Sequence, residues 1–299
     1  MNEIFSVLIP SWNNLPYLKL CVESIRKNST YRHQIIVHVN EGTDGTLDWV
    51  QSEGLDYTHS EQNVGVCLAM NMMRSKVKTD YIVFFNDDMY ACPNWDEALL
   101  SEIKKLPNNH FCFSATVIQR HMKRDRPIIQ ADYGDSIENF KEERLLGDYS
   151  SFLVKDLHDA TAPPNIIHRE VWDLVGGYSV EFSPGFGSDP DLTMKLYFCG
   201  IRMMKSVGAS RVYHFECKST HRVKNACRDV LFIFKWGFSW RTARMLTWSG
   251  LPYNARNIGY FNYNRMVRWH MLRSRLKIVW YALTLRSFGP LHKFYKQKR

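Results

Sequence analysis

The chain of 299 residues has no apolar run that reaches the roughly 18 residues of a membrane-spanning helix, because charges interrupt the longest candidates, near 230–234 and 278–285. It has no basic and apolar leader followed by a small-residue cleavage site, so we expect no secretory signal. Its seven cysteines show no regular spacing and no Cys-x-x-Cys pair. This argues against a disulfide framework and favours the reducing cytoplasm.

Repeats of a fixed period, low-complexity segments and the phosphate-binding pattern GxxxxGK are also absent. Their absence excludes a solenoid, a disordered chain and a P-loop enzyme. What is present is a composition with 45% hydrophobic and 14% aromatic residues. Such a chain can bury one large core, or a core with an appendage.

Acidic residues are almost missing from the C-terminal part of the chain. The net charge is +9, but residues 215–299 hold 18 Lys and Arg residues against only Glu216 and Asp229. Residues 1–214 hold the other 21 Lys and Arg residues together with 28 Asp and Glu residues. We therefore predict a mildly acidic body, residues 1–220, and a basic segment, residues 221–299.

Short β-branched and aromatic runs alternate with helical patterns in the first half of the chain. This alternation predicts an α/β fold with a mostly parallel central sheet and helices on both faces. We interpret residues 121–155, which are charged and irregular, as an insertion or acceptor-side loop. We expect strands at 5–10, 33–40, 56–60, 81–85, 111–119, 165–168 and 211–215, with helices at 15–27, 66–76, 93–106, 170–175 and 190–199.

Polar side chains follow three of the expected strands. Ser11, Asn40 and Glu41 come after the first two, and Asn86, Asp87 and Asp88 after the fourth. In open α/β sheets the carboxyl ends of the strands form the edge at which ligands bind. We therefore expect these residues to share one rim.

Asp87 and Asp88 are adjacent carboxylates, which repel each other unless a cation lies near them. Mg²⁺ and Mn²⁺ prefer oxygen ligands and leave coordination sites open for substrate phosphates. The alternative is a solvated turn, which Asn-Asp sequences also favour.

Two further residues are candidates for chemistry. Asp189 follows a glycine-rich loop and precedes Pro190, so it suits a general base for an acceptor hydroxyl and also the N-cap of a helix. His214 ends a strand and is either structural or a metal ligand.

These motifs together resemble glycosyltransferase family 2 over residues 4–215. The matching segments are SVLIPSWNN at 6–14, VNEGTDGT at 39–46, NVG at 63–65 with Asn71, FNDDM at 85–89, GGY at 176–178, SDPDL at 188–192 and VYH at 212–214. The resemblance implies the GT-A fold, with a nucleotide-sugar half of about residues 1–110 and an acceptor half of about residues 111–220. It also implies an inverting transferase that needs Mn²⁺ or Mg²⁺.

The resemblance also implies a role for each matching residue. Asp189 is the base, and Asp88 and His214 are the metal ligands. The nucleotide-sugar donor is bound by Pro10, Ser11, Asn40, Glu41, Asn63, Gly65, Asn86 and Asp87. Three positions depart from the family pattern: Asn86 stands for the first Asp of the Asp-x-Asp motif, the Asn40–Glu41 pair stands for two Asp residues, and Ser188 stands for a Glu. The Asn40–Glu41 departure implies that recognition of the nucleotide base differs, and none of the three departures removes the metal ligand or the catalytic base.

These expectations describe a hexosyl-type transferase that acts on a glycan or lipid-linked acceptor in surface polysaccharide or glycoconjugate biosynthesis. A sugar nucleotidyltransferase is the alternative enzyme, although the Gly-rich, Arg- and Lys-containing loop that it uses is missing after the first strand. A non-catalytic RNA- or lipid-binding protein with a degenerate transferase body is the third reading.

The basic segment from residue 221 also contains many tryptophans and tyrosines. Arg-rich helices with aromatic faces lie on anionic lipid, so we expect peripheral attachment to the inner face of a membrane. Packing of the aromatics onto the body, or binding of nucleic acid, are the alternatives; nucleic acid is the one we favour least.

Overall fold

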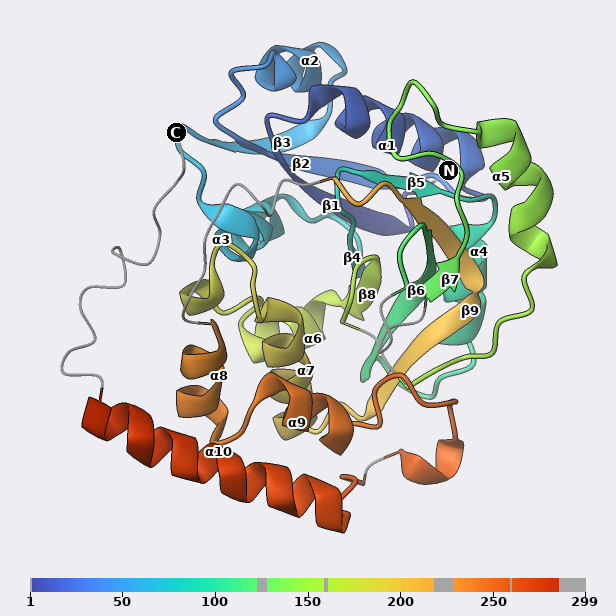
Figure 1. Ribbon diagram of the computed structural model, residues 1–299. Helices are drawn as coiled ribbons and strands as arrows, with labels where there is room; N and C mark the ends of the chain where they lie inside the picture. Colours follow the sequence, from blue (N-terminus) through green and yellow to red (C-terminus); the bar gives the residue numbers. More distant parts are fainter. Residues whose placement is uncertain (1, 123–127, 159–160, 218–227, 259, 285–299) are drawn as a thin grey trace.

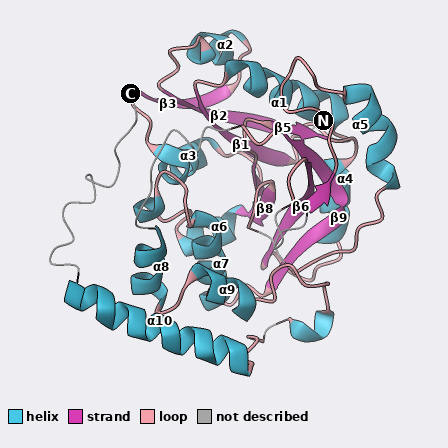
Figure 2. Ribbon diagram, in the orientation of Figure 1, coloured by secondary structure: helices cyan, strands magenta, loops and turns pink. Residues whose placement is uncertain are grey.

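The computed structural model describes residues 2–122, 128–158, 161–217, 228–258 and 260–284. In this part of the chain a mixed sheet carries helices on both faces (Figure 1; Figure 2). The strands are β1 (Phe5–Trp12), β2 (Gln34–Asn40), β3 (Asp56–Ser60), β4 (Tyr81–Phe84), β5 (Met89–Ala91), β6 (Phe111–Gln119), β7 (Ile128–Gln130), β8 (Asn165–His168) and β9 (Met203–His214). The helices are α1 (Leu15–Asn28), α2 (Thr46–Ser52), α3 (Gly65–Met73), α4 (Trp95–Ile103), α5 (Glu142–Asp148), α6 (Arg169–Val175), α7 (Ser188–Phe198), α8 (Arg228–Trp236), α9 (Trp240–Leu246) and α10 (Arg265–Thr284).

The strand order is β3-β2-β1-β4-β8-β6-β9-β5, with β7 paired to β6. β3, β2, β1 and β4 run parallel, whereas β8 runs antiparallel to β4 and β6, and β5 runs antiparallel to β9. The α/β class predicted from the sequence is confirmed, with antiparallel strands confined to one half of the sheet. Helical connections follow β1, β2 and β3, as parallel neighbours require.

β9 is longer than the strand expected at 211–215, since it begins at Met203. Its first half was missed because it contains a lysine and a glycine. Lys205 is buried there, and its ammonium lies 2.5 Å from Glu102 and 2.9 Å from Asp156. A buried charge of this kind needs partners that only the folded chain brings together.

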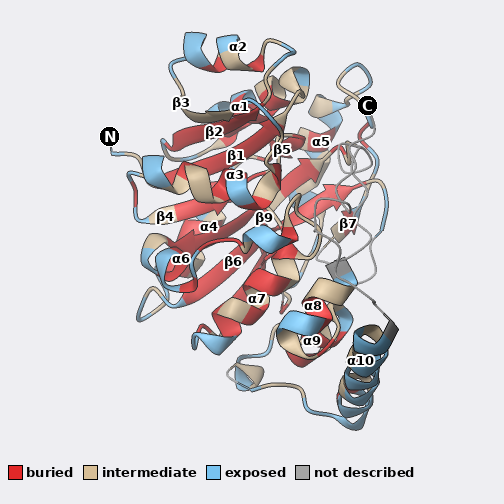
Figure 3. Ribbon diagram, turned by 90° about the vertical axis from the view of Figure 1, so that its left-hand side faces the viewer, coloured by how far each residue is buried: buried red, intermediate tan, exposed pale blue. Residues whose placement is uncertain are grey.

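Two large apolar clusters cover the two faces of the sheet. One joins α1 and α4 to β1 and β6 through residues such as Leu18 and Trp95. The other joins α3, α6 and α7 to the opposite face through residues such as Met70, Trp172 and Leu192. Figure 3 shows the buried strands between helices whose exposed faces point outward.

The segment after β9 packs onto this second cluster. Phe232 of α8, Ala243 of α9 and Val267 of α10 all belong to it. Backbone bonds also join the segment to the body, because His158 N–H donates to the Leu251 carbonyl (2.8 Å) and Tyr253 N–H donates to the Asp156 carbonyl (2.9 Å). For α8 and α9 these contacts agree with the alternative in which the aromatic residues of the basic segment pack onto the body.

α10 differs from α8 and α9. It lies at the outside of the molecule, drawn mostly as exposed in Figure 3, and touches the rest through a narrow stripe that includes Val267 and Ser274. Within the described residues, no helix has the length and apolar composition needed to span a bilayer. None of the six described cysteines is bonded to another.

The expectation of an irregular loop at 121–155 was wrong in part. The described residues there include β7, which extends the sheet beside β6, and α5. Tyr133, Leu145 and Tyr213 form a separate small core under this region. The aromatic residues therefore stabilise regular structure in a segment whose charged sequence predicted an irregular loop.

Candidate active site

Three of the predicted residues, Ser11, Asn40 and Asp87, meet at the carboxyl edge of the parallel strands. The Ser11 hydroxyl donates to an Asp87 carboxylate oxygen at 2.7 Å, and the Asn40 amide donates to the Ser11 carbonyl at 3.3 Å. The Asn40 side-chain oxygen accepts from the backbone N–H of Val64 at 2.9 Å. Asn40 therefore joins the ends of β1 and β2 to the turn before α3.

Glu41 and Pro10 take different places at this rim. Glu41 has a φ of +62°, and its carboxylate accepts from the Asn13 amide at 3.0 Å. Asn13, which sequence reasoning did not single out, also accepts from the N–H groups of Gly42 and Thr43. Pro10 lies inside β1, buried and paired with His38 of β2, one residue before Ser11.

The turn at Asn63 and Gly65 reaches the loop that precedes Asp189. Asn63 accepts from Gly65 N–H at 2.8 Å, and Val66 N–H donates to the Pro184 carbonyl at 3.0 Å. Gly65 has a φ of +75°, and a Cβ there would lie 2.5 Å from the Pro184 Cα. Only glycine permits this close approach.

Asp87 and Asp88 diverge, so they do not form a paired carboxylate site. Asp87 points to Ser11 of β1, whereas Asp88 points to the end of β9. There an Asp88 carboxylate oxygen lies 3.2 Å from the His214 Nε2, and the other oxygen accepts from Cys217 N–H at 2.8 Å. The side chain of Asn86 is part-exposed beside them.

Asp88 is 6% exposed. Burial raises the pKa of its carboxyl, but His214 and the Cys217 N–H outweigh burial, so the pKa lies below its ordinary value. Asp88 is therefore a buried anion at neutral pH.

Gln119, at the end of β6, orients His214 and was missed from the sequence. Its amide nitrogen faces two acceptors, the His121 carbonyl and a Glu216 carboxylate oxygen. Its oxygen therefore faces the His214 Nδ1, 3.2 Å away, and this makes Nδ1 the protonated nitrogen. The signal that could have found Gln119 is its position, a polar residue ending a wholly buried strand.

This arrangement fits a divalent cation. With Nδ1 facing Gln119, the Nε2 that lies 3.2 Å from the Asp88 carboxylate either carries a second proton, in which form His214 lowers the pKa of Asp88, or gives its lone pair to a cation in place of that proton. In the described residues no three His, Cys, Asp or Glu side chains gather as a metal cage. Two protein ligands suit an ion that takes its other ligands from water and substrate phosphates.

Asp189 is not the N-cap of its helix, contrary to the sequence interpretation. α7 begins at Ser188, its N-cap is Gly187 with a φ of +90°, and no side chain caps it. The glycine allowed the helix to begin earlier than Pro190 indicated. The Asp189 carboxylate lies in the first turn of α7, where the helix dipole favours an anion.

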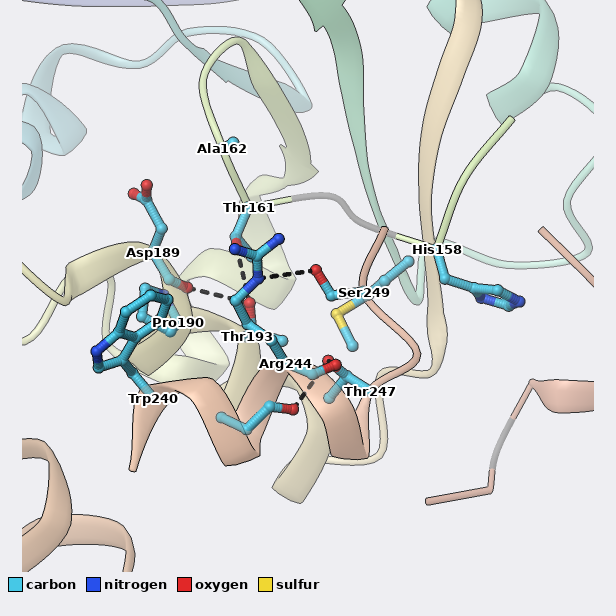
Figure 4. Close-up of a pocket in the computed structure, with 12 residues that line it drawn as sticks. His158, Thr161, Ala162, Asp189, Pro190, Thr193, Trp240, Arg244, Thr247 and Ser249 are labelled. Carbon is cyan, nitrogen blue, oxygen red and sulfur yellow. Dashed lines mark hydrogen bonds between the residues drawn. The ribbon is translucent and has the colours of Figure 1, made fainter. Parts of the chain in front are cut away.

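A pocket of ≈ 60 Å³ lies beside Asp189. Figure 4 shows Arg244 of α9 between Asp189 and His158, next to Thr161. The pocket is lined by His158, Thr161, Ala162, Asp189, Pro190, Thr193, Met204, Trp240, Ala243, Arg244, Thr247 and Ser249. Its wall thus combines the body with the segment after β9.

The chain is similar to known proteins in sequence and in fold. The model of glycosyl transferase family 2 matches residues 6–171. The glycosyltransferase GlyG of Streptococcus pneumoniae serotype 4 is 32% identical over 111 residues, which are 35% of this chain and 36% of that protein. The match therefore spans about a third of that relative's length.

Solved structures of low sequence identity share the fold. TarS (residues 1–349) of S. aureus in complex with UDP has a TM-score of 0.52 at 13% identity, over 71% of this chain and 60% of that one. GalNAc-T7 with UDP, GalNAc and Mn²⁺ has a TM-score of 0.51 at 15% identity, over 95% of this chain and 58% of that one.

Proposed function

The chain belongs to glycosyl transferase family 2, and from this we propose that it transfers a hexose from a nucleoside-diphosphate sugar to a hydroxyl group of a glycan or lipid-linked acceptor, with inversion. Its place would be surface polysaccharide or glycoconjugate biosynthesis. The pairing of buried Asp88 with a His214 that Gln119 orients carries this proposal.

Each residue then has a defined task. Asp88 and His214 would hold Mn²⁺ or Mg²⁺, which would neutralise charge on the leaving diphosphate. Ser11, Asn40, Asn63 and Gly65 bind the donor along the rim. Asp189 takes the proton of the acceptor hydroxyl, whose oxygen bonds to the anomeric carbon as the bond to the diphosphate breaks on the opposite face. A single displacement inverts the anomeric configuration.

Metal-dependent nucleotide binding tests this proposal. Wild-type protein is titrated with UDP, other nucleoside diphosphates and their sugars, with and without Mn²⁺, and the melting temperature is followed. We expect stabilisation that needs both nucleotide and Mn²⁺. Asp88→Asn should abolish it. Asp80→Asn, at an exposed ion pair just before β4, is the matched control.

The same protein is assayed for turnover. Release of nucleoside diphosphate from a sugar donor supports a transferase, whereas formation of a nucleotide sugar from a triphosphate and a sugar phosphate would indicate the nucleotidyltransferase alternative. Binding without any turnover would indicate a degenerate body. Equal Mn²⁺ dependence in Asp88→Asn and wild type would contradict the metal assignment.

We also propose that α10 attaches the protein to the cytoplasmic face of an anionic membrane. Its outward side chains are Met266, Trp269, Leu272, Leu276, Val279, Trp280 and Leu283, which are 48–79% exposed. At 3.6 residues per turn these positions form one stripe opposite Val267 and Ser274. An exposed apolar stripe of this length marks an interaction surface.

Charge supports lipid as the occupant of this stripe. Exposed basic residues flank it on both sides, Arg268 and Arg275 on one and Arg273 and Lys277 on the other. α10 contains no acidic residue. Apolar side chains between two basic rows match the depth profile of an anionic lipid surface, and match nucleic acid poorly.

A further inference from the structure

We infer that the pocket beside Asp189 is the acceptor site, and that it takes a sugar joined to a phosphate group. This inference rests on the proposed function, because it identifies Asp189 as the base. The acceptor hydroxyl must lie against that carboxylate. The pocket is therefore where the remainder of the acceptor is recognised.

The charges at the pocket carry the choice of acceptor. Among its described lining residues, Asp189 and Arg244 are the charged side chains. The third titratable group, His158, is neutral at pH 7, since burial lowers its pKa below the ordinary value and its Nε2 accepts from Asn254 N–H. A ligand that places a hydroxyl at Asp189 therefore meets one guanidinium, which binds phosphate oxygens in a fork.

The rest of the lining suits a sugar. Four residues that carry hydroxyl groups, Thr161, Thr193, Thr247 and Ser249, are among those that line the pocket. Trp240 adds a flat surface that matches the apolar face of a pyranose ring. A volume of ≈ 60 Å³ holds about four or five water-sized groups, so the pocket receives one side of a sugar and its substituent.

α9 holds Trp240 and Arg244 rigidly in this wall. Its N-cap is Ser239, whose hydroxyl accepts from Thr242 N–H at 3.2 Å, and Thr242, Ala243 and Leu246 are buried against the body. Arg244 Nε donates to the Ser249 hydroxyl at 3.2 Å, which fixes the arginine stem. The acceptor wall is thus built on a packed helix, whereas residues 141–152 line a separate pocket with Tyr133.

Ligand titration with paired probes tests the inference. The 1-phosphates of glucose, galactose and N-acetylglucosamine are compared with their methyl glycosides, in the presence of UDP and Mn²⁺, by ligand-observed NMR. We expect at least one 1-phosphate to bind about tenfold or more tightly than its methyl glycoside. Arg244→Gln should remove this preference, because it keeps a donor near Ser249 and loses the charge.

Arg241→Gln is the matched control, since Arg241 is an exposed arginine of the same helix outside the pocket. It should keep the preference within about twofold of wild type. Circular dichroism and UDP–Mn²⁺ affinity show whether each variant is folded. An octyl phosphodiester of the preferred sugar distinguishes the source: tighter binding than the monoester indicates a lipid-linked acceptor, and equal binding a free sugar phosphate or phosphate-containing polymer.

Two results would overturn the inference: no 1-phosphate preferred over its methyl glycoside in wild type, or a preference that survives Arg244→Gln. Failure of the proposed function is visible separately, as wild-type protein that does not bind UDP with Mn²⁺. Binding of the sugar phosphates is measured directly and does not depend on turnover.

Discussion

The buried carboxylate of Asp191 accepts a hydrogen bond of 2.8 Å from the indole N–H of Trp236, and so joins the helix of Asp189 to α8. The same carboxylate accepts from the Ser179 hydroxyl at 2.6 Å and lies 2.8 Å from the Lys235 ammonium. Asp191 is fully buried, so these partners replace its water. The Asp191 carboxylate therefore holds α7, which carries the candidate base, against α8 of the segment after β9.

Asp191→Ala should therefore destabilise the protein by roughly 2–4 kcal/mol, because it leaves several donors without their acceptor. Trp236→Phe should lose roughly 1–2 kcal/mol, since the ring remains and one hydrogen bond is lost. Urea unfolding measures both. Asp173→Asn, in an exposed pair with Arg74, is the control and should change stability by less than about 1 kcal/mol. Equal effects for Asp191→Ala and the control would refute the role of Asp191.

Asp189→Asn should reduce turnover by roughly 10²–10⁴ while UDP–Mn²⁺ binding stays unchanged, because only proton acceptance is lost. Since Gly187 and not Asp189 occupies the N-cap, stability should change little. Single-turnover kinetics and urea unfolding measure the two effects. Glu170→Gln, an exposed carboxylate on α6, serves as control. Turnover close to wild type would exclude Asp189 as the base.

Gln119→Met should weaken Mn²⁺ binding in the presence of UDP by about 10–100-fold, because His214 loses the acceptor that fixes its Nδ1 proton. His214→Ala should weaken it by a similar factor. Because Gln119 acts through His214, the double variant should be no worse than His214→Ala alone. Calorimetry measures the three affinities. Additive losses would mean that Gln119 supports the fold and does not orient the histidine.

Stability should fall between pH 6.5 and pH 4 because of His38. Burial lowers the pKa of this fully buried residue of β2 to about 4, and its ring nitrogens contact the Thr58 and Ser60 hydroxyls. The unfolded chain takes up a proton near pH 6.5 and the folded chain does not until about pH 4, so lowering the pH favours unfolding across this window.

The loss from His38 should be on the order of 3 kcal/mol, complete below about pH 4. Urea unfolding at pH 7.0, 5.5 and 4.5 measures it, and His38→Gln should flatten the dependence, since glutamine does not titrate. A variant whose slope with pH equals that of wild type would show that other groups cause the loss.

The α10 surface should bind anionic vesicles. Wild-type protein should float with them and float less with neutral vesicles, and salt should weaken but not abolish binding. Trp269→Glu with Trp280→Glu should abolish flotation. The control, Leu174→Glu with Val180→Glu, alters two residues that are also exposed but lie away from α10. Flotation of the α10 variant, or a wild-type dimer that the α10 changes dissociate, would contradict the membrane proposal.

Much of the fold was predictable because the buried strands are continuous runs of β-branched and aromatic residues. β3, β6 and β8 have the bounds expected from the sequence, and β1 and β2 differ by at most two residues at an end. In β5 the three residues Met89–Ala91 are too few to show a period. α5 and β7 were not predicted because they are stabilised by aromatic packing between residues far apart in the sequence.

The candidate site was predictable in its residue types and not in its contacts. A strand end supplies Asp88 and another supplies His214, and the motifs indicate both. The role of Gln119 depends on its contact with His214, which lies 95 positions away in the sequence. The role of Arg244 depends on the packing of α9, which places it in the pocket beside Asp189. Local pattern carries no information on such pairings.

The backbone bonds between residues 156–158 and 250–253 have a consequence for protein engineering. They run across the junction where a chimera with a related enzyme would ordinarily be cut, after β9. A swap at that junction would exchange Trp240 and Arg244, and it would also replace one side of these backbone hydrogen bonds. A cut between Tyr263 and Arg265 leaves these backbone bonds and α9 intact, and it exchanges α10 together with the residues that follow it. Recombination at that position would change the proposed membrane-binding helix and leave the proposed acceptor pocket unchanged.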